Sequence, residues 1–378
     1  MSKGTSNAEE AGSGIFGVLR SWFDHPVVRN SAINLLQSLV AILVAVVIGA
    51  ILIFVVGEDP LQAYGAMFRG AFIGLPSIAR TLRMASPLII TGLAVVVAFR
   101  AGFIYLGMEG SLYIGALASA LLAIYVGNGL PVVLQLPLAL IIGGAAGGAW
   151  AFLPAYLKAR LNIDEVVATL MLNYIAVLVV DHLVYTYFQD PIDGSNAERA
   201  LTLPIPEAAR LPFLLEDYGL TASIIVGVVL VGIFMWVYSR SVWGYESVMT
   251  GLNRRFARYG GVSTFKMAIT SMVLSGILAG LAGATESLGI YGRYVGGFSA
   301  DLGFDGVTVA LMGRLTPLGT LIGAIFFGAL KNGGTSMEMA VNVPRDLVIV
   351  VQGLILLFVT AQSLFVLLKL GRHERPEE

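Results

Sequence analysis

Long apolar runs separated by short polar segments make up most of this chain. A membrane-spanning helix needs about 20 mostly apolar residues, and the run 32–56, which contains no charged residue, is the clearest example. Further runs of this kind cover 82–98, 106–126, 132–157, 166–188, 220–238, 267–290 and 347–368. The pattern predicts an all-α integral membrane protein, a polytopic helix bundle with about eight to ten transmembrane segments.

The apolar stretch 304–330 does not fit one straight helix. Arg314, Thr316 and Pro317 interrupt it, which favours two half-helices around a turn. Non-helical backbone at membrane depth is tolerated only where protein or water covers it, and such breaks commonly line a transport path. We therefore expect a broken or re-entrant region near 304–330.

The polar segments between the runs differ in charge. Segment 240–266 holds five basic residues and one acidic residue, whereas 188–219 holds six acidic residues and two basic ones. Because cytoplasmic loops carry an excess of Lys and Arg, we expect 240–266 to be a cytoplasmic loop and 188–219 an extracytoplasmic one. We expect the polar leader 1–31 and the tail 371–378 to be cytoplasmic as well, on either side of a transmembrane domain that covers 32–370.

Composition supports the membrane assignment and excludes several functions. The chain has 378 residues, of which 57% are hydrophobic and only 12% are charged, against about 25% charged in soluble domains. The net charge of −1 gives no reason to expect a nucleic acid partner, and no cysteine and only three scattered histidines are present, so we expect no metal. The absence of any Gly-Lys dipeptide excludes a P-loop for ATP. We expect neither catalysis nor a cofactor bound by this chain.

The basic segment 240–266 contains a short amphipathic pattern. Leu252, Phe256 and Tyr259 are spaced i, i+4 and i+7, which predicts one helical face, and arginines occupy other positions of the same helix. Such a helix at a membrane surface can dock on a soluble motor subunit. The alternative is a basic amphipathic helix that rests on anionic lipid.

Ionisable residues inside apolar runs are candidates for a translocation path. Glu109 lies between two glycines at the start of an apolar run. A carboxylate deep in a membrane costs about 2.5–3.5 kcal/mol, so Glu109 either lines or gates the path, or is stabilised by a helix N-terminus. The other candidates are Asn173, Glu286, Tyr291, Arg293, Asp305 and Arg314.

Three motifs, in matching order, resemble one transporter family. Residues 106–116 resemble the signature N-I-G-x-E-G-Q-x-x-x-G-A, residues 251–262 resemble G-x-N-P-x-A-A-R-Y-A-G-I, and residues 304–319 resemble G-F-x-G-I-A-V-A-L-L-G-x-x-x-P-x-G. These signatures are typical of the ABC importer permeases of the branched-chain amino acid/simple sugar class, most of all of the nucleoside-type branch. The resemblance covers about 32–368. The departures are Tyr105 for Asn, Arg254 for Pro and Ser111 for Gln.

The resemblance implies a permease subunit in the plasma membrane of a prokaryote. It would work with an ABC ATP-binding subunit, a second permease subunit (a copy or a paralogue) and an extracytoplasmic solute-binding protein, and ATP would be bound by the partner. The cargo would be a small polar solute, preferably a nucleoside and next a simple sugar, moved by alternating access. The implied ATPase-coupling residues are Gly251, Leu252, Asn253, Arg255, Phe256, Arg258 and Tyr259.

A second hypothesis belongs to a different class of transporter. Glu109, Glu286 and Asp305 could relay protons or ions in a secondary transporter. Such a protein would need no ATPase subunit, whereas a permease subunit cannot work without one.

Overall fold

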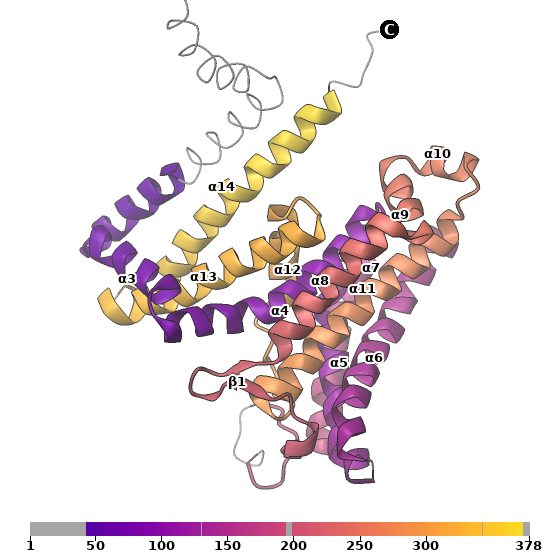
Figure 1. The fold of residues 1–378 in the computed structure, drawn as a ribbon, viewed down its shortest axis with the longest axis horizontal. Coiled ribbons are helices and arrows are strands. Elements are labelled where there is room, and N and C mark those ends of the chain that lie inside the picture. Colours follow the sequence, from indigo (N-terminus) through magenta and orange to yellow (C-terminus); the bar gives the residue numbers. More distant parts are fainter. Residues whose placement is uncertain (1–42, 130, 194–198, 342, 373–378) are drawn as a thin grey trace, which may run out of the picture.

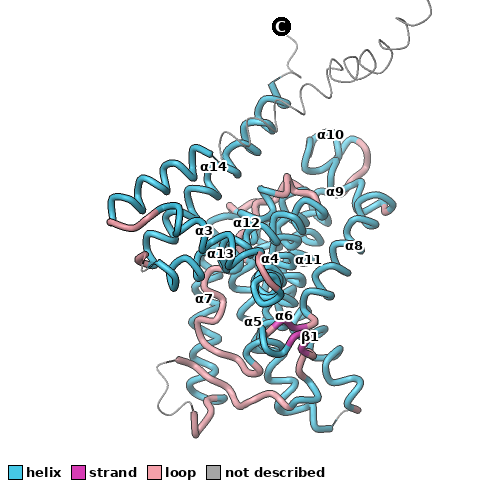
Figure 2. Tube along the Cα trace, turned by 60° about the vertical axis from the view of Figure 1, so that its left-hand side comes forward, coloured by secondary structure: helices cyan, strands magenta, loops and turns pink. Residues whose placement is uncertain are grey.

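The computed structural model describes residues 43–129, 131–193, 199–341 and 343–372, and helices dominate this part of the chain (Figure 1). The helices are 43–56, α3 (Pro60–Phe72), α4 (Leu75–Arg100), α5 (Met108–Leu121), α6 (Val132–Leu161), α7 (Glu165–Leu183), α8 (Ser223–Arg240), α9 (Val242–Leu252), α10 (Arg254–Tyr259), α11 (Thr264–Glu286), α12 (Leu302–Met312), α13 (Pro317–Val341) and α14 (Arg345–Arg372). Single π-helical turns extend α5 to Val126, α7 to Phe188 and α11 to Tyr291. The only described sheet pairs β1 (Phe213–Leu215) with β2 (Leu220–Thr221), as Figure 2 shows.

Six of the described helices are long and apolar enough to cross a membrane: Leu75–Arg100, Met108–Val126, Val132–Leu161, Glu165–Phe188, Ser223–Arg240 and Thr264–Tyr291. Each coincides with a predicted run to within a few residues, except that α4 begins earlier than the predicted 82. Helices 43–56 and α3 form a seventh candidate if the bent pair counts as one span. These helices confirm the polytopic bundle. The predicted number of about eight to ten segments is reached only if α13 and α14 are counted as membrane spans as well.

The bend between 43–56 and α3 was not predicted. The two helices meet at 120°, and α3 begins where the Asp59 side chain accepts a hydrogen bond from the backbone N–H of Leu61, with Pro60 in the first helical position. Both features favour a new helix start. Residues 32–42 of the predicted run 32–56 and the whole leader 1–31 lie outside the described residues, as does the tail after residue 372.

Helix α4 runs through the centre of the molecule, between α3, α13 and α14 on one side and α5, α6, α7 and α11 on the other (Figure 1). Helix α11 packs against α5 and α6 with almost no side chain between the backbones. A Cβ on Gly280 would lie 2.5 Å from the carbonyl oxygen of Gly143, and a Cβ on Gly147 would lie 2.5 Å from that of Gly276. Close approach through small residues is how helices associate in lipid.

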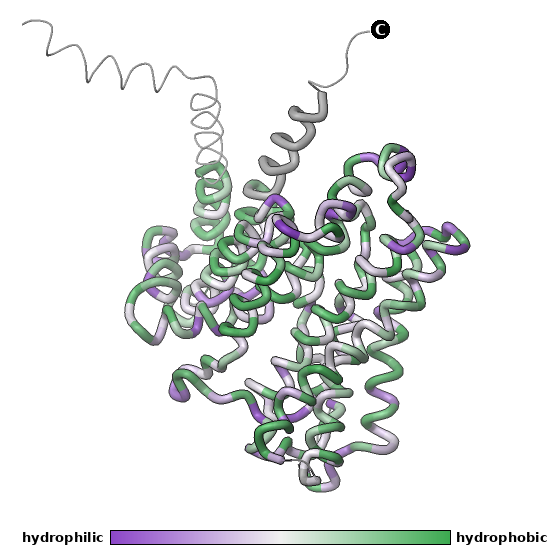
Figure 3. The backbone as a smooth tube through the Cα atoms, turned by 45° about the vertical axis from the view of Figure 1, so that its right-hand side comes forward, coloured by the Kyte–Doolittle hydropathy of each residue, from purple (hydrophilic) through white to green (hydrophobic). Residues whose placement is uncertain are grey.

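The polar segments gather at two opposite ends of the bundle (Figure 3). One end, here called the basic end, carries α9, α10 and the turn between α6 and α7. The other, the acidic end, carries loop 188–219, β1 and β2 (Figures 1 and 2). Loop 188–219 is ordered in its described parts by an antiparallel bridge between Leu201 and Val295 and by ion pairs of Arg293 with Asp190 and Asp193.

The 304–330 region is divided as predicted, but unequally. Helix α12 has 11 residues, a turn at Gly313–Thr316 follows, and α13 has 25 residues, so only α12 has the length of a half-helix. Arg314 and Leu315 in the turn have positive φ values of 53°, and the Thr316 hydroxyl donates to the carbonyl oxygen of Gly313 at 2.8 Å. The chain enters α12 from a non-helical segment, 292–301, which begins at the acidic end.

Candidate functional site

The loop between α8 and α11 contains two short helices where the sequence predicted one. Helix α9 ends at Leu252 and α10 begins two residues later. Asn253 between them has an extended backbone (φ −155°, ψ 103°), and its side-chain oxygen accepts hydrogen bonds from the N–H groups of Arg255 and Phe256 at 3.0 Å. Asn favours this N-cap position over a helix interior. The prediction of one continuous helical face from Leu252 to Tyr259 is therefore wrong.

The three apolar side chains of this loop are nevertheless uncovered. Leu252 is 79% exposed, Phe256 59% and Tyr259 93%, while Arg255 and Arg258 are exposed beside them. Large apolar side chains grouped at a polar end of a protein mark an interaction site. We call α9, Asn253 and α10 the coupling loop from here on, after the role that the resemblance implies for it.

Gly251 fixes the coupling loop to the turn after α4. A Cβ on Gly251 would lie 2.2 Å from the carbonyl oxygen of Arg100. A Cβ on Gly102, whose φ is +81°, would in turn lie 2.9 Å from the Gly251 Cα. Arg254 adds a second attachment, because its guanidinium donates to the carbonyl oxygen of Gly102 and lies 4.5 Å from the ring centroid of Phe103. Movement of the coupling loop must therefore involve segment 101–107.

Segment 101–107 leads from the coupling loop to the start of α5 without forming a helix. Side chains satisfy its backbone: Asn173 donates to the carbonyl oxygen of Leu106 at 2.7 Å and accepts from the N–H of Gly110 at 2.9 Å. The buried Tyr105 hydroxyl contacts Ser111 Oγ at 2.9 Å. These two substitutions relative to the family signature, Tyr for Asn and Ser for Gln, thus form a mutual hydrogen bond.

Glu109 joins the start of α5 to the start of α12. Its side chain is buried, and Oε2 accepts a hydrogen bond of 2.8 Å from the N–H of Gly303 in the first turn of α12. Glu109 also lies in the first turn of α5. A carboxylate at helix N-termini is favoured by the helix dipole. The geometry agrees with the helix N-terminus interpretation of Glu109 and makes it a link between two elements.

Asp305 is held by a residue that the sequence analysis missed. Lys331 of α13 forms an ion pair with Asp305 of α12 and lies 5.5 Å from the ring centroid of Phe327. Lys331 falls in an apolar stretch just beyond the limits chosen for the broken region. The cost of burying a charge in lipid, which singled out Asp305, applies equally to Lys331 and could have found it.

Breaking this ion pair is expected to destabilise the protein, and removing both charges is not. Lys331→Met leaves the carboxylate of Asp305 without its partner, at a cost of about 1–3 kcal/mol, below the values for fully buried pairs because both side chains are partly exposed. The double variant Asp305→Asn, Lys331→Met is expected to recover most of this loss. The measurement is thermal unfolding of the detergent-purified variants. Additive effects of the two substitutions would refute the coupling between them.

The four other residues predicted for the translocation path lie apart from Glu109 and Asp305. Tyr291 packs on Phe298 with ring centroids 5.8 Å apart, at the acidic end. Arg293 holds loop 188–219 through its two ion pairs. Glu286 is buried in α11, and its Oε1 makes no hydrogen bond with the described residues. Arg314 is exposed in the turn between α12 and α13. The structure therefore gathers Glu109, Asn173 and Asp305 around α5 and α12 and leaves the other four apart.

The acidic end also contains an aromatic group around segment 292–301. Tyr294 is buried, its ring centroid lies 5.9 Å from that of Phe298, and its hydroxyl donates to Asp181 Oδ1 at 3.3 Å. Burial raises the pKa of the Tyr294 phenol above its usual range, and the nearby Asp181 raises it further. The phenol therefore stays neutral. Among the described residues, no group of His, Cys, Asp and Glu side chains could hold a metal ion.

The fold defines a class of protein: a polytopic helical membrane protein that exposes large apolar side chains on a loop at one polar end. The family model described as "Branched-chain amino acid transport system / permease component" matches residues 77–360. The chain belongs to this family and is an ABC transporter permease subunit. Its relatives are transporter permeases rather than enzymes, and the family does not support the hypothesis of an ion- or proton-coupled secondary transporter.

Three curated relatives match nearly the whole chain. The guanosine ABC transporter permease protein NupP of Bacillus subtilis is 37% identical over 87% of this chain and 93% of its own length. The nucleoside ABC transporter permease protein NupB of Lactococcus lactis is 31% identical over 88% and 93%. A glucose ABC transporter permease of Haloferax volcanii is 31% identical over 87% and 88%.

All three organisms have a second permease that is similar to this chain and is named for the same solute. In Haloferax volcanii, the putative glucose permease TsgC13 is 27% identical over 69% of this chain. In Bacillus subtilis, the guanosine permease NupQ is 24% identical over 71% of this chain. In Lactococcus lactis, the nucleoside permease NupC is 24% identical over 66%. In each organism one permease is thus more similar to this chain than the other, with the largest difference in Bacillus subtilis.

Proposed function

We propose that this chain is a permease subunit of an ATP-driven nucleoside importer in the plasma membrane of a prokaryote. The observation that carries the proposal is the 37% identity to a guanosine permease, which extends over 93% of that relative's length. A nucleoside permease at 31% supports the same cargo. The glucose permease at 31% makes a simple sugar the second candidate.

The proposed partner at the coupling loop is an ABC ATP-binding subunit. Leu252, Phe256 and Tyr259 would enter a groove of that subunit, and Arg255 and Arg258 would lie at its rim, where charges favour association. This places the basic end in the cytoplasm, in agreement with the bias of Lys and Arg. ATP would be bound by the partner. A solute-binding protein would meet the acidic end.

For the second permease subunit, we favour a paralogue over a second copy. The guanosine transporter of Bacillus subtilis and the nucleoside transporter of Lactococcus lactis each have two named permeases, and this chain resembles one of them much more than the other. The same division in two transporters is expected if the two subunits occupy different positions in a heterodimer.

Within this chain, the proposed transmission of movement follows the observed contacts. ATP binding would shift the coupling loop, Gly251 and Arg254 would pass the shift to segment 101–107, and Glu109 would carry it to α12. Helix α12, short and entered through non-helical backbone, would then change access to the path.

Uptake of labelled guanosine by cells with and without this gene tests the cargo. Deletion is expected to abolish uptake and re-expression to restore it. Excess unlabelled adenosine is expected to compete with guanosine, and excess glucose is not. If the deletion leaves guanosine uptake intact, the nucleoside proposal fails, and loss of labelled glucose uptake in the same deletion would make the sugar the favoured cargo.

A further inference from the structure

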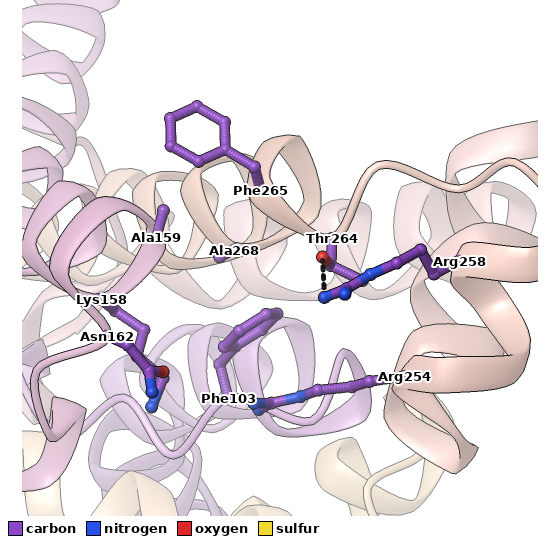
Figure 4. A pocket seen from close by; sticks show the side chains of 9 residues that line it. All are labelled: Phe103, Lys158, Ala159, Asn162, Arg254, Arg258, Thr264, Phe265 and Ala268. Carbon is purple, nitrogen blue, oxygen red and sulfur yellow. Dashed lines mark hydrogen bonds between the residues drawn. The ribbon is translucent and has the colours of Figure 1, made fainter.

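A cavity lies at the basic end, behind the coupling loop. It has a volume of about 450 Å³ and is formed where the end of α6, the start of α11, α10 and segment 101–107 meet (Figure 4). Its lining residues are Phe103, Lys158, Ala159, Asn162, Arg254, Arg258, Thr264, Phe265 and Ala268. The volume falls within the range of small-molecule sites.

Positive charge enters the cavity from two sides. Figure 4 shows Lys158 and Asn162 on the α6 side and Arg254 and Arg258 on the α10 side, with the ring of Phe103 between them. Lys158 is balanced by an ion pair with Glu165. The coupling loop thus forms one wall of a basic cavity whose other wall belongs to the membrane bundle.

The two arginines of the cavity have no acidic partner among the described residues. Arg254 donates to a backbone carbonyl oxygen, and Arg258 donates to Thr264 Oγ1 at 3.4 Å. The ion pairs of the described chain involve neither of them. A guanidinium has five N–H donors, so both side chains retain donors for an anion. Phosphate oxygens suit this planar, permanently charged group.

The cavity also lies at the ends of two helices that are long and apolar enough to cross a membrane. Helix α6 ends at Leu161 and α11 begins at Thr264, and both are membrane-spanning candidates. Around the cavity, Leu161 is 61% exposed, Ile163 41% and Phe265 42%. An apolar fringe beside a cationic cavity fits a molecule with a phosphate and an acyl portion. Basic pockets between helices at a cytoplasmic surface are typical sites for anionic headgroups.

We propose that this cavity binds a phosphate group, held by Arg254 and Arg258 of α10, with Lys158 and Asn162 of the α6 side opposite them. The phosphate could belong to the headgroup of an anionic phospholipid, which the apolar fringe favours, or to a soluble phosphate compound. The inference does not depend on the transported solute, and its test measures binding, not transport.

Native mass spectrometry of the full-length chain, purified in detergent, tests the proposal with three probes: phosphatidylglycerol, inorganic phosphate and a nucleoside monophosphate. Arg254→Gln is expected to weaken binding of the accepted probe about fivefold, and Arg254→Gln with Arg258→Gln to weaken it further. The matched control is Arg255→Gln, the neighbouring arginine of the same helix, which does not line the cavity. It is expected to bind as the wild type does.

A second variant tests the cavity without changing charge. Ala159→Leu fills part of the space and is expected to weaken binding of phosphatidylglycerol more than binding of inorganic phosphate, because the lipid needs more room. Preference for phosphatidylglycerol identifies the lipid, and preference for a soluble probe identifies a soluble phosphate compound.

Two results would overturn the proposal. One is equal weakening by Arg255→Gln and Arg254→Gln, which would indicate general attraction to a basic surface. The other is the absence of binding of all three probes to the isolated chain, to be followed by a test for burial of Arg254 and Arg258 when the ATP-binding subunit is added. Such burial would assign the cavity to an acidic side chain of the partner protein.

Discussion

Gly251→Ala is expected to abolish ATP-driven uptake while the protein still inserts into the membrane. The added Cβ would lie 2.2 Å from the carbonyl oxygen of Arg100 and 3.2 Å from the N–H nitrogen of Gly102. Both contacts are backbone atoms, so no side-chain rotation relieves them, and the end of α9 must move away from the turn after α4. Overpacking of this kind costs about 1–3 kcal/mol, enough to separate the coupling loop from segment 101–107.

The matched control is Gly260→Ala, at the residue that directly follows α10. The nearest neighbour of a Cβ on Gly260 would be the carbonyl oxygen of Ala257, at an ordinary contact distance of 3.4 Å, so uptake should remain near the wild-type rate. The measurement is initial uptake rate per amount of protein in the membrane, with ATPase association checked in parallel. Normal uptake by Gly251→Ala would contradict the proposed transmission through the Arg100–Gly102 turn.

The second large effect is expected from Phe256→Asp, which should prevent association with the ATP-binding subunit. Phe256 is 59% exposed in this chain, and the proposed interface would bury it. Truncation of an aromatic anchor in an interface typically costs 2 kcal/mol or more, about a 30-fold loss of affinity, and a buried carboxylate adds its desolvation cost. Copurification of the ATP-binding subunit with a tagged chain measures the loss.

Phe213→Asp provides the control for this substitution. Phe213 lies in β1 at the acidic end and is 41% exposed, so the same chemical change there should leave ATPase recovery unaltered. Full recovery of the ATP-binding subunit with Phe256→Asp would show that the coupling loop is not the docking surface. The variants Gly251→Ala and Phe256→Asp should also differ from each other. Gly251→Ala should keep the association with the ATP-binding subunit and lose transport, whereas Phe256→Asp should lose both.

The membrane spans could be predicted from the sequence because the cost of burying polar groups in lipid acts on every residue of a span. Six runs match described helices closely. The bend before α3 was harder to predict, because a helix start depends on a single cap, here Asp59, in a stretch that is otherwise helical on both sides. The division at Asn253 has the same cause, since one side chain outweighs a favourable apolar spacing.

The partners of the candidate residues could be predicted less well than the residues themselves. The cost of a charge in lipid pointed to Glu109 and Asp305 but not to the atoms that compensate them. The N–H of Gly303 lies far from Glu109 in the sequence, and the amine of Lys331 lies far from Asp305. They contact these carboxylates only because α12 begins beside α5 and α13 folds back along α12. Likewise, Gly251 and Gly102 meet because α4 and α9 end at the same place. Such pairs depend on tertiary structure and leave no local pattern.

Reconstitution into liposomes tests the central claim most directly. The chain would be incorporated with the paralogous permease and the ATP-binding subunit, the solute-binding protein and labelled guanosine would be added on the outside, and ATP would be enclosed. We expect uptake that requires enclosed ATP and all subunits, and that ion gradients alone do not support. Gradient-driven uptake by this chain alone, without ATP or the ATP-binding subunit, would contradict the account.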